Sequence, residues 1–356
     1  MRLTALSGFG SKGPACFLLD TGGRRLLLDL GRGPDGDALP DLAGVGRVDG
    51  ILISHGHVDH TGGLHLAGGP GDPPVFAPEP AIALARDGGL AAAHPLDRAG
   101  AALGLRIDLG PAGHAPGACW MRIGGPEGLV YTGDLSQESS LYRATLPPPA
   151  RALVFDASYG DADEPLPAQV AGLLALAAAG PLLLPAPAGG RGLEMALTFR
   201  AAGHEVAICP AHRMVAEAMV ARPGWLAPGG AAALADLLSG ARPLAPDGPV
   251  RGVMIAAGPN AERGVAGALA PRLLAEGTGR VVFTGHLAEG TPAPGWVAGG
   301  GALFRRWNVH PTLTGMRAIL DAVSPDTAMP AFCAPAAQRA LAALIPNLTA
   351  AREMTW

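Results

Sequence analysis

The sequence predicts an α/β protein built from two parts. The first 155 residues or so alternate short apolar runs with loops, a pattern typical of β-strands joined by turns. From about residue 160, helical stretches alternate with short apolar runs, the pattern of a small α/β domain with parallel strands. After about residue 305 the sequence pattern again resembles that of the first part. We therefore predict one larger domain that is interrupted by an inserted α/β domain.

Each part can be divided into elements. The clearest strands of the first part are Leu26–Asp29, Gly50–Ser54, Leu129–Thr132 and Ala152–Phe155. The insertion is expected to contain helices at Leu166–Ala179, Leu193–Ala202 and Ala261–Glu276, and strands at Pro181–Pro185, Glu205–Cys209, Val253–Ala257 and Arg280–Thr284. The tail is expected to form helices at Met316–Val323 and Ala336–Leu344 beside a strand at Ala328–Cys333. The predicted domain boundaries are 1–159 and 306–356 for the first domain and 160–305 for the insertion.

Composition excludes several classes of protein. A chain of 356 residues with 49% hydrophobic residues can bury one large core or two moderate ones. The net charge of −4 provides no overall basic field, so a polyanion would have to be held locally. The four cysteines are far apart, which argues against a zinc knuckle or a disulfide framework. No signal peptide and no run of roughly 20 apolar residues is found, so we expect a cytoplasmic protein.

The segment 53–63 carries most of the chemical information. His55, His57, Asp59 and His60 occupy six positions directly after an apolar run. In an extended chain, His55 and His57 share one side and can bind one ion, while Asp59 and His60 turn the other way and can bind a second. Imidazole and carboxylate are ligands that suit Zn²⁺. A purely structural role is disfavoured because each buried polar side chain would need its own partner.

This segment matches the HxHxDH signature of the metallo-β-lactamase superfamily. Three further segments resemble the other motifs of that superfamily in the right order: Asp29 after an early strand, His114 in the glycine-rich turn 112–118, and Asp134 after the strand at 129–132. The resemblance implies an αββα sandwich. It also implies a first metal held by His55, His57, His114 and Asp134, and a second held by Asp59, His60 and Asp134.

The rest of the chain resembles the β-CASP group of this superfamily, which contains nucleases that process RNA and DNA. The resemblance lies in three segments: Leu153–Gly160 with its acidic residue Asp156, Pro187–Glu194 with a Gly-Arg helix entrance, and Phe283–Thr291. It implies that the insertion is a β-CASP-like cap domain. It also implies two Zn²⁺ ions that activate water to cleave a phosphodiester, leaving a 3′-hydroxyl and a 5′-phosphate.

The sequence departs from the β-CASP pattern near its end. The group's final motif is a strand followed by His-Gly-Glu, whose histidine binds the second metal. Here the strand is followed by Cys333, and no histidine lies beyond His310. Cys333 either replaces the missing ligand, since thiolate binds zinc well, or is a small buried hydrophobe. In the second case the second metal has only three ligands and binds weakly.

The resemblance also suggests catalytic and substrate-binding residues. Asp59, His310 and Asp156 are the catalytic candidates. His310 would protonate the leaving oxygen, and Asp156 would orient its imidazole. The alternatives are that His310 is only a loop residue before Pro311 and that Asp156 only caps the turn at Ser158.

Phosphate binding would fall to Arg191, because arginine makes bidentate contacts to phosphate. Ser158, Thr284 and Thr291 are the candidate hydroxyl donors beside it. The remaining histidines match no motif and are expected to be structural or exposed: His65, His94, His204, His212 and His286.

Three hypotheses about function follow. The first is a zinc-dependent metallo-hydrolase that cleaves phosphodiester bonds, a ribonuclease of the β-CASP type with RNA as its substrate. The second is a metallo-hydrolase acting on a small phosphodiester, an ester or a thioester. The third is a non-catalytic partner subunit. A membrane partner is not expected, and a homodimer is left open.

Overall fold

A computed structural model describes residues 1–85 and 88–356, and the chain divides into two compact units. Unit 1 comprises Met1–Gln137, Arg143–Asp163 and His310–Trp356, and unit 2 comprises Glu138–Tyr142 and Glu164–Val309. The predicted insertion, 160–305, overlaps unit 2, which begins and ends a few residues later and includes an additional short segment. That the insertion is a separate domain stays a prediction.

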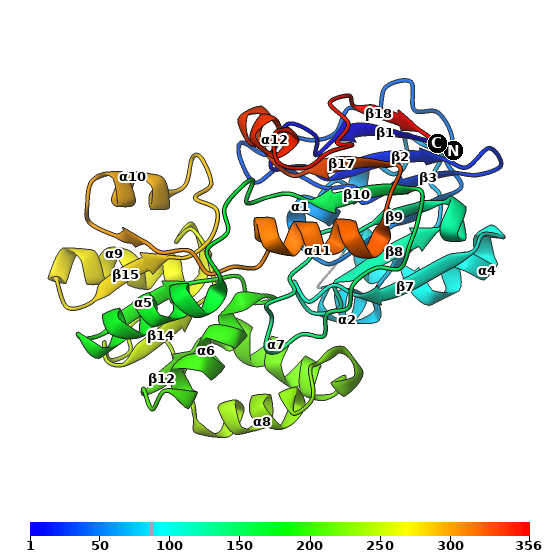
Figure 1. Ribbon diagram of the computed structural model, residues 1–356. Helices are drawn as coiled ribbons and strands as arrows, with labels where there is room; N and C mark the ends of the chain where they lie inside the picture. Colours follow the sequence, from blue (N-terminus) through cyan, green and yellow to red (C-terminus); the bar gives the residue numbers. More distant parts are fainter. Residues whose placement is uncertain (86–87) are drawn as a thin grey trace. The chain divides into compact units, whose positions relative to one another are not determined.

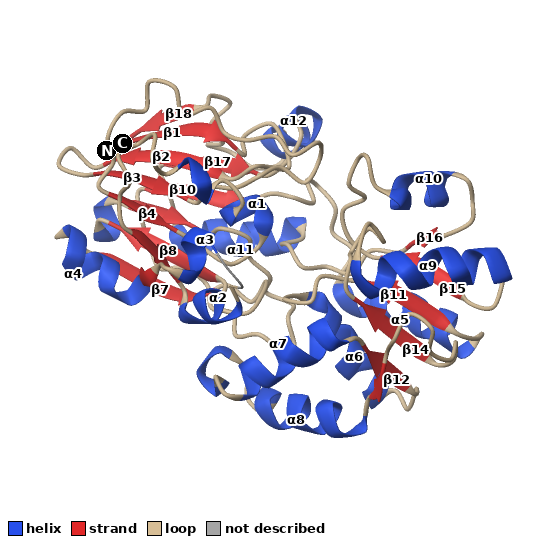
Figure 2. Ribbon diagram, turned by 180° about the vertical axis from the view of Figure 1, so that it is seen from behind, coloured by secondary structure: helices blue, strands red, loops and turns tan. Residues whose placement is uncertain are grey.

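Unit 1 contains two β-sheets (Figure 1). The strands of its seven-stranded sheet, in spatial order, are β18 (Glu353–Thr355), β1 (Arg2–Ser7), β2 (Cys16–Asp20), β3 (Arg25–Leu28), β4 (Gly50–Leu52), β5 (Val75–Ala77) and β6 (His94–Pro95). The five-stranded sheet has the order β17 (Thr327–Ala331), β10 (Ala152–Asp156), β9 (Leu129–Tyr131), β8 (Cys119–Ile123) and β7 (Ile107–Pro111). Because β18 pairs antiparallel with β1, the two ends of the chain lie side by side (Figure 2).

The central strands of unit 1 are buried on both faces, because their apolar side chains alternate between two cores. In β2, Phe17 and Leu19 point into the core between the two sheets, whereas Leu18 belongs to the core on the outer face of the first sheet. In β10, Val154 faces the core between the sheets and Phe155 faces the outer core of the second sheet. Strands that pack on both faces read as continuous apolar runs, which is the pattern seen in the sequence.

Helices cover both outer faces of unit 1. On the second sheet, Met316 and Ile319 of α11 (Leu313–Val323) and Leu341 of α12 (Pro335–Ala342) join the outer core. On the first sheet, the covering segments include η1 (Leu64–Leu66), α2 (Glu79–Leu84) and α3 (Gly88–Ala91). The order is helix, sheet, sheet, helix, which is the predicted αββα sandwich. The remaining short helices of this unit are α1 (Val58–Thr61), η2 (Leu96–Arg98), α4 (Ala99–Leu103) and η3 (Gly125–Glu127).

Unit 2 has one six-stranded sheet whose described pairings are all parallel. Its strands, in spatial order, are β13 (Arg242–Pro243), β12 (Val206–Ile208), β14 (Val253–Ala256), β11 (Leu182–Pro185), β15 (Arg280–Phe283) and β16 (Leu303–Phe304). Its helices are α5 (Leu166–Ala178), α6 (Arg191–Ala201), α7 (Pro210–Val220), η4 (Pro223–Trp225), α8 (Gly230–Gly240), α9 (Gly264–Glu276) and α10 (Pro292–Ala298). Among the described residues, none of the helices has the length and apolar character needed to cross a membrane.

Candidate metal centre

The polar cluster of unit 1 is built by loops that follow its strands. His55 and His57 come directly after β4, Asp134 comes after β9, and Asp156 is the last residue of β10. The chain leaves each of these strands at its carboxyl end, where functional groups commonly gather in α/β folds. His114 is supplied by the loop between β7 and β8.

Glycine makes the close approach of these loops possible. Gly113, next to His114, has φ of 73°, and a Cβ added there would lie 2.2 Å from the carbonyl oxygen of Ser136. At Gly31 an added Cβ would lie 1.7 Å from the carbonyl oxygen of Asp59. Any larger residue would therefore push these loops away from the cluster.

Three groups of side chains each bring their ligand atoms within 4.8 Å of one another. They are His55, His57 and His114; His55, His60 and Asp134; and His114, Asp134 and His310. The groups share members, so they form one continuous cluster. The structure thus brings together residues from positions 55 to 310 of the chain.

The side-chain atoms of the cluster lie close enough together to bind the same metal ion. Nδ1 of His57 lies 3.1 Å from Nε2 of His114, and Nε2 of His114 lies 3.4 Å from Oδ2 of Asp134. Nε2 of His60 lies 3.3 Å from Oδ1 of Asp134. This oxygen nevertheless has no hydrogen bond of good geometry.

His55 provides the clearest sign that the cluster can bind a metal ion. Its side chain is fully buried, and its Nε2 has no hydrogen-bond partner among the described residues. Burial and the neighbouring imidazoles of His60, His57 and His114 hold the pKa of His55 well below its usual value. The side chain is therefore neutral, which is the form that binds metal. A buried nitrogen without a partner is costly unless it binds something, so the residues present fit a metal ion.

His60 is held by Asp29. Nδ1 of His60 lies 2.7 Å from Oδ2 of Asp29, which also accepts hydrogen bonds from the hydroxyls of Ser54 (2.7 Å) and Tyr131 (2.5 Å). This contact directs Nε2 of His60 toward Asp134, as carboxylates do for histidine ligands of metals. Burial lowers the pKa of His60, but the carboxylates of Asp134 and Asp29 outweigh it and raise that pKa well above its usual value.

The structure does not bring Asp59 or Cys333 into any of the three groups, among the described residues. Asp59 is half-buried on α1. Cys333 lies in the apolar outer core of the second sheet with Leu135 and Phe155, and burial raises the pKa of its thiol to about 12. The aromatic ring of Phe332 packs 5.2 Å from the ring of His60 instead. Ligand roles for Asp59 and Cys333 stay predictions.

His310 and Asp156 are in direct contact. Nδ1 of His310 lies 2.7 Å from Oδ2 of Asp156. The other oxygen, Oδ1, accepts hydrogen bonds from the backbone N–H (3.0 Å) and the hydroxyl (2.6 Å) of Ser158. Asp156 therefore contacts both the turn at Ser158 and the imidazole of His310, and its role in catalysis stays a prediction.

Sequence reasoning missed Lys12. Its ammonium nitrogen donates a hydrogen bond to Oγ of Ser158 (2.9 Å) and lies 3.2 Å from Nε2 of His310. Burial opposes the charged form, but Asp134, Asp156 and Asp59 outweigh it and raise the pKa of Lys12. A signal was present in the sequence: Lys12 is the only lysine of the chain, and it lies in a glycine-rich segment close to the first strand.

The other phosphate-binding candidates belong to unit 2. Arg191 is buried at the start of α6, and its Nε donates a hydrogen bond to Oγ1 of Thr284 (2.9 Å). The hydroxyl of Thr291 donates to the carbonyl oxygen of Ala288 (2.6 Å). The structure therefore brings Arg191 and Thr284 together, and their role toward a substrate stays a prediction.

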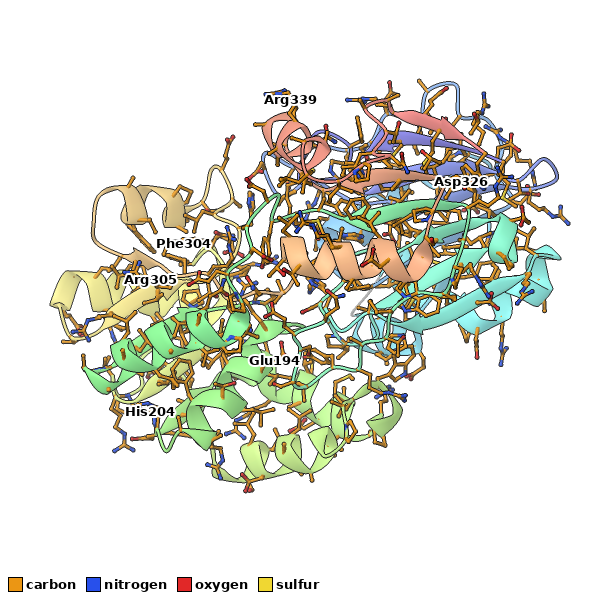
Figure 3. The ribbon with its side chains drawn as sticks, viewed as in Figure 1. Glu194, His204, Phe304, Arg305, Asp326 and Arg339 are labelled. Atoms are coloured by element: carbon orange, nitrogen blue, oxygen red, sulfur yellow. The ribbon has the colours of Figure 1, made fainter. Side chains whose placement is uncertain are left out.

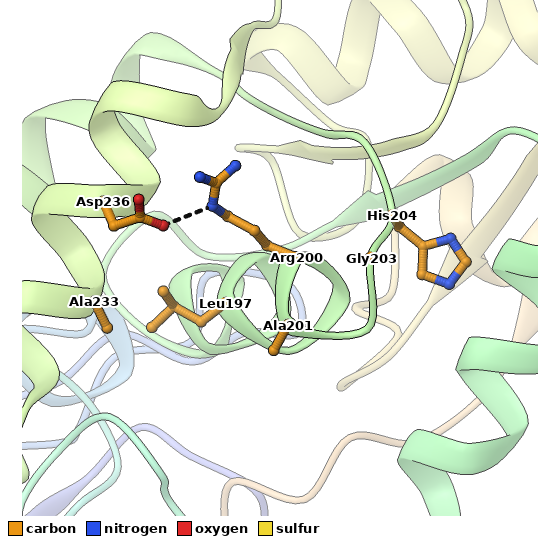
Figure 4. A pocket seen from close by; sticks show the side chains of 7 residues that line it. All are labelled: Leu197, Arg200, Ala201, Gly203, His204, Ala233 and Asp236. Carbon is orange, nitrogen blue, oxygen red and sulfur yellow. Dashed lines mark hydrogen bonds and ion pairs between the residues drawn. The ribbon is translucent and has the colours of Figure 1, made fainter.

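Unit 2 also has a surface hollow between α6 and α8 (Figure 4). Leu197, Arg200, His204 and Asp236 are among the residues that line it. The guanidinium of Arg200 is paired with the carboxylate of Asp236, with Nε 2.9 Å from Oδ2. The two charged side chains of the hollow neutralise each other in this exposed ion pair and are not available to a charged ligand. We therefore assign no function to the hollow.

The αββα layering and the histidine–aspartate cluster together define a class of metal-binding sandwich proteins. Residues 11–177 match the model of the Metallo-beta-lactamase superfamily, so this part of the chain is similar to a metallo-β-lactamase domain. The predicted fold class is thus confirmed. Over its whole length the chain also resembles a solved structure, a protein of unknown function from Enterococcus faecalis V583, with a TM-score of 0.56 and 12% identity, covering 100% of this chain and 99% of that one. That likeness concerns the fold alone.

Sequence relatives include proteins that process RNA. The transcription termination factor FttA of Cenarchaeum symbiosum is 31% identical over 56% of this chain and 39% of its own length. Ribonuclease TTHA0252 of Thermus thermophilus is 30% identical over 45% of this chain and 44% of its own length. Cleavage and polyadenylation specificity factor subunit 2 of Oryza sativa subsp. japonica is 38% identical over 24% of this chain and 12% of its own length. The matched segments thus span less than half the length of these relatives, which agree with the β-CASP resemblance.

Proposed function

We propose that this protein is a metal-dependent hydrolase that cleaves phosphodiester bonds in RNA. One observation carries the proposal: the imidazoles of His55, His57 and His114 converge with Asp134 in a largely buried cluster where Nε2 of His55 has no hydrogen-bond partner among the described residues. Relatives named as a ribonuclease and as a transcription termination factor support RNA as the substrate class.

We propose two zinc ions as the cofactor. His55, His57, His114 and Asp134 would hold the first, and His60 and Asp134 would hold the second with help from Asp59. When bound, the two ions would supply a nucleophilic water at neutral pH and neutralise charge on the phosphoryl oxygens. The second ion is expected to bind more weakly, because Cys333 belongs to none of the ligand groups among the described residues.

The chain's own residues would supply the proton. The leaving oxygen of a phosphodiester needs a proton as the bond to phosphorus breaks, and His310 would deliver it from Nε2. Asp156 would fix the ring through Nδ1 and stabilise the imidazolium before that transfer. Ser158 would help to position the phosphate. Phosphate-binding roles for Arg191, Thr284 and Thr291, and a cap-domain role for unit 2, stay predictions. A cytoplasmic location and a homodimer stay predictions.

The proposal is tested by metal analysis and cleavage assays on the same preparations. Protein loaded with zinc and then dialysed should retain close to two ions per chain and should cleave single-stranded RNA. His55→Ala and Asp134→Ala should each reduce cleavage by about 10³-fold or more, since several kcal/mol of transition-state stabilisation are lost. Unchanged cleavage in either variant would refute the assignment.

A small phosphodiester is the second candidate substrate. The net charge of −4 favours it, because the chain has no overall basic field for a long polyanion. Assays with bis-p-nitrophenyl phosphate, RNA, single-stranded DNA and a thioester separate the candidates. Hydrolysis of the small diester without cleavage of RNA would replace the ribonuclease assignment, and hydrolysis of the thioester alone would remove both.

A further inference from the structure

Lys12 is placed as an anion-binding residue of the candidate site. It comes from the loop between β1 and β2, and its half-buried side chain reaches the residues that surround His310. A lysine ammonium has three N–H donors and accepts no hydrogen bond. Two of them are used, one by Oγ of Ser158 and one by Nε2 of His310. The third has no partner among the described residues.

The surroundings of Lys12 also have the charge that this role requires. The carboxylates of Asp134 and Asp156 are its strongest charged neighbours, and they keep the side chain protonated. Asp134 belongs to two of the ligand groups, and Asp156 touches His310. The ammonium therefore lies beside both the proposed ligands and the proposed proton donor, while keeping one donor for a further partner.

We propose that Lys12 binds a non-bridging phosphoryl oxygen of the substrate and is thus a second anchor for the phosphate besides the metal centre. This inference rests on the proposed function, whose substrate is a phosphodiester. An ammonium that moves onto a phosphoryl oxygen would also free Nε2 of His310, which would take up a proton from solvent water and then deliver it to the leaving oxygen. Lys12 would act in binding and would not act as a metal ligand.

The competing explanation is structural. Lys12 could do no more than neutralise Asp134 and Asp156, and it would then stabilise the fold and the metal cluster without contacting substrate. The two roles predict different results for metal content and for anion binding. A decisive experiment therefore measures both quantities on the zinc-loaded protein, and activity comes second.

The first measurement compares Lys12→Met, which removes the charge, with Lys12→Arg, which keeps it. The control is Arg339→Met on the exposed face of α12 (Figure 3), which changes the net charge equally. Zinc content is measured by mass spectrometry, and inorganic phosphate binding is measured by calorimetry. Lys12→Met should keep its zinc and bind phosphate roughly ten- to hundredfold more weakly. Lys12→Arg should stay within about fivefold of the natural protein because the charge remains.

Three results would overturn the inference. One is phosphate affinity in Lys12→Met equal to that of the Arg339→Met control. Another is a loss of zinc in Lys12→Met together with the loss of phosphate binding, which would assign Lys12 to the metal cluster. A third is phosphate affinity in Lys12→Arg as low as in Lys12→Met.

A second measurement does not depend on the folding of any variant. Because Lys12 is the only lysine, protein that carries lysine labelled with ¹³C at Cε gives one side-chain signal, and all three N–H donors are retained. The Lys12 signal should move as inorganic phosphate is added to the zinc-loaded protein. A Lys12 signal that stays fixed at saturating phosphate would overturn the inference.

Failure of this inference can be told apart from failure of the proposed function. Protein that binds phosphate through Lys12 but cleaves neither RNA nor bis-p-nitrophenyl phosphate would remove the proposed function and leave the anchor. Protein that cleaves RNA and binds phosphate equally well with and without Lys12 would remove only the anchor.

Discussion

Two fully buried histidines, one in each unit, differ in the hydrogen-bond partners of their ring nitrogens. In unit 2, Nε2 of His212 donates to the carbonyl oxygen of Pro187 (3.2 Å), and its Nδ1 accepts from the thiol of Cys209 (3.1 Å). In unit 1, Nδ1 of His55 is near the hydroxyl of Ser54 (3.1 Å), but its Nε2 has no partner among the described residues. Both are neutral at pH 7, since burial lowers the pKa of each, that of His212 to about 4. Only His55 keeps a nitrogen available for a ligand.

The buried carboxylates differ in the same way. Burial disfavours the ionised form of Asp134 in unit 1. The side chains of His60, Lys12, His310 and His114 outweigh this effect and hold the pKa of Asp134 well below its usual value. Among the described residues, Glu194 of unit 2 (Figure 3) accepts hydrogen bonds from neutral groups alone: the hydroxyl of Ser139 and the backbone N–H groups of Ser140 and Leu141. Burial therefore raises the pKa of Glu194 to about 7. A closed structural network and an open ligand cluster can thus be told apart by their charges and their unpaired atoms.

The largest expected effect that tests this comparison is the pH dependence from Glu194. Because the pKa of Glu194 is higher in the folded state than its ordinary value of 4.5, its stabilising contribution is complete below pH 4.5 and is lost as pH rises through about 7. The difference corresponds to on the order of 3 kcal/mol. Glu194→Gln should remove this dependence. The free energy of unfolding of this variant, relative to that of the natural protein, should therefore rise between pH 5 and pH 8.

Urea denaturation at several pH values measures the change. Glu217→Gln, on the exposed side of α7, is the matched control and should follow the natural protein. Parallel pH profiles for Glu194→Gln and the natural protein would show that Glu194 is ionised throughout this range, which would break the contrast with Asp134.

The next effect concerns the support of the ligand cluster. Asp29→Asn keeps the size of the side chain but weakens the contact that orients His60. Supporting carboxylates of this kind typically change metal affinity or activity 10- to 100-fold, or about 1.4 to 2.7 kcal/mol. We expect Asp29→Asn to lower zinc affinity by about this factor in a competition assay with a chelator. The exposed Asp97→Asn variant is the control, and equal affinities would mean that His60 binds no metal.

The smallest expected effect comes from Cys333. Because its side chain packs in the apolar outer core of the second sheet, Cys333→Ala should leave the number of bound zinc ions unchanged. The free energy of unfolding should fall by only about 1 kcal/mol, since little volume is removed. Metal analysis after dialysis is the measurement. Loss of one zinc ion in this variant would show instead that the thiolate of Cys333 is a ligand of the second metal.

Much of the fold could be predicted from the sequence because its signals are local. The apolar runs at β3, β4, β9 and β10 and the helices α5 and α11 were predicted to within a few residues. Helix α8 was not predicted, because alanine and glycine in this segment give little contrast between an apolar and a polar face. Helix α7 was also missed, although its buried residues Val215, Ala216 and Met219 lie at helical spacing. Strands β1, β2, β7 and β8 were also not singled out, although β1 pairs with β2 and β7 pairs with β8 across short connections in the chain. The strand preference of a short segment depends on what it packs against, which the sequence does not display.

By itself the sequence determined the kind and order of the candidate metal-ligating groups, because His55, His57, Asp59 and His60 are neighbours and their imidazoles and carboxylate are groups that can bind a metal. Only the tertiary structure decided which of them meet. It paired His60 with Asp29, brought Lys12 beside His310, and turned Cys333 into the apolar core while Phe332 packs on His60. The reason is physical: the choice of ligand atom depends on loop conformations, such as the φ of 62° at Phe332, that packing with distant segments fixes.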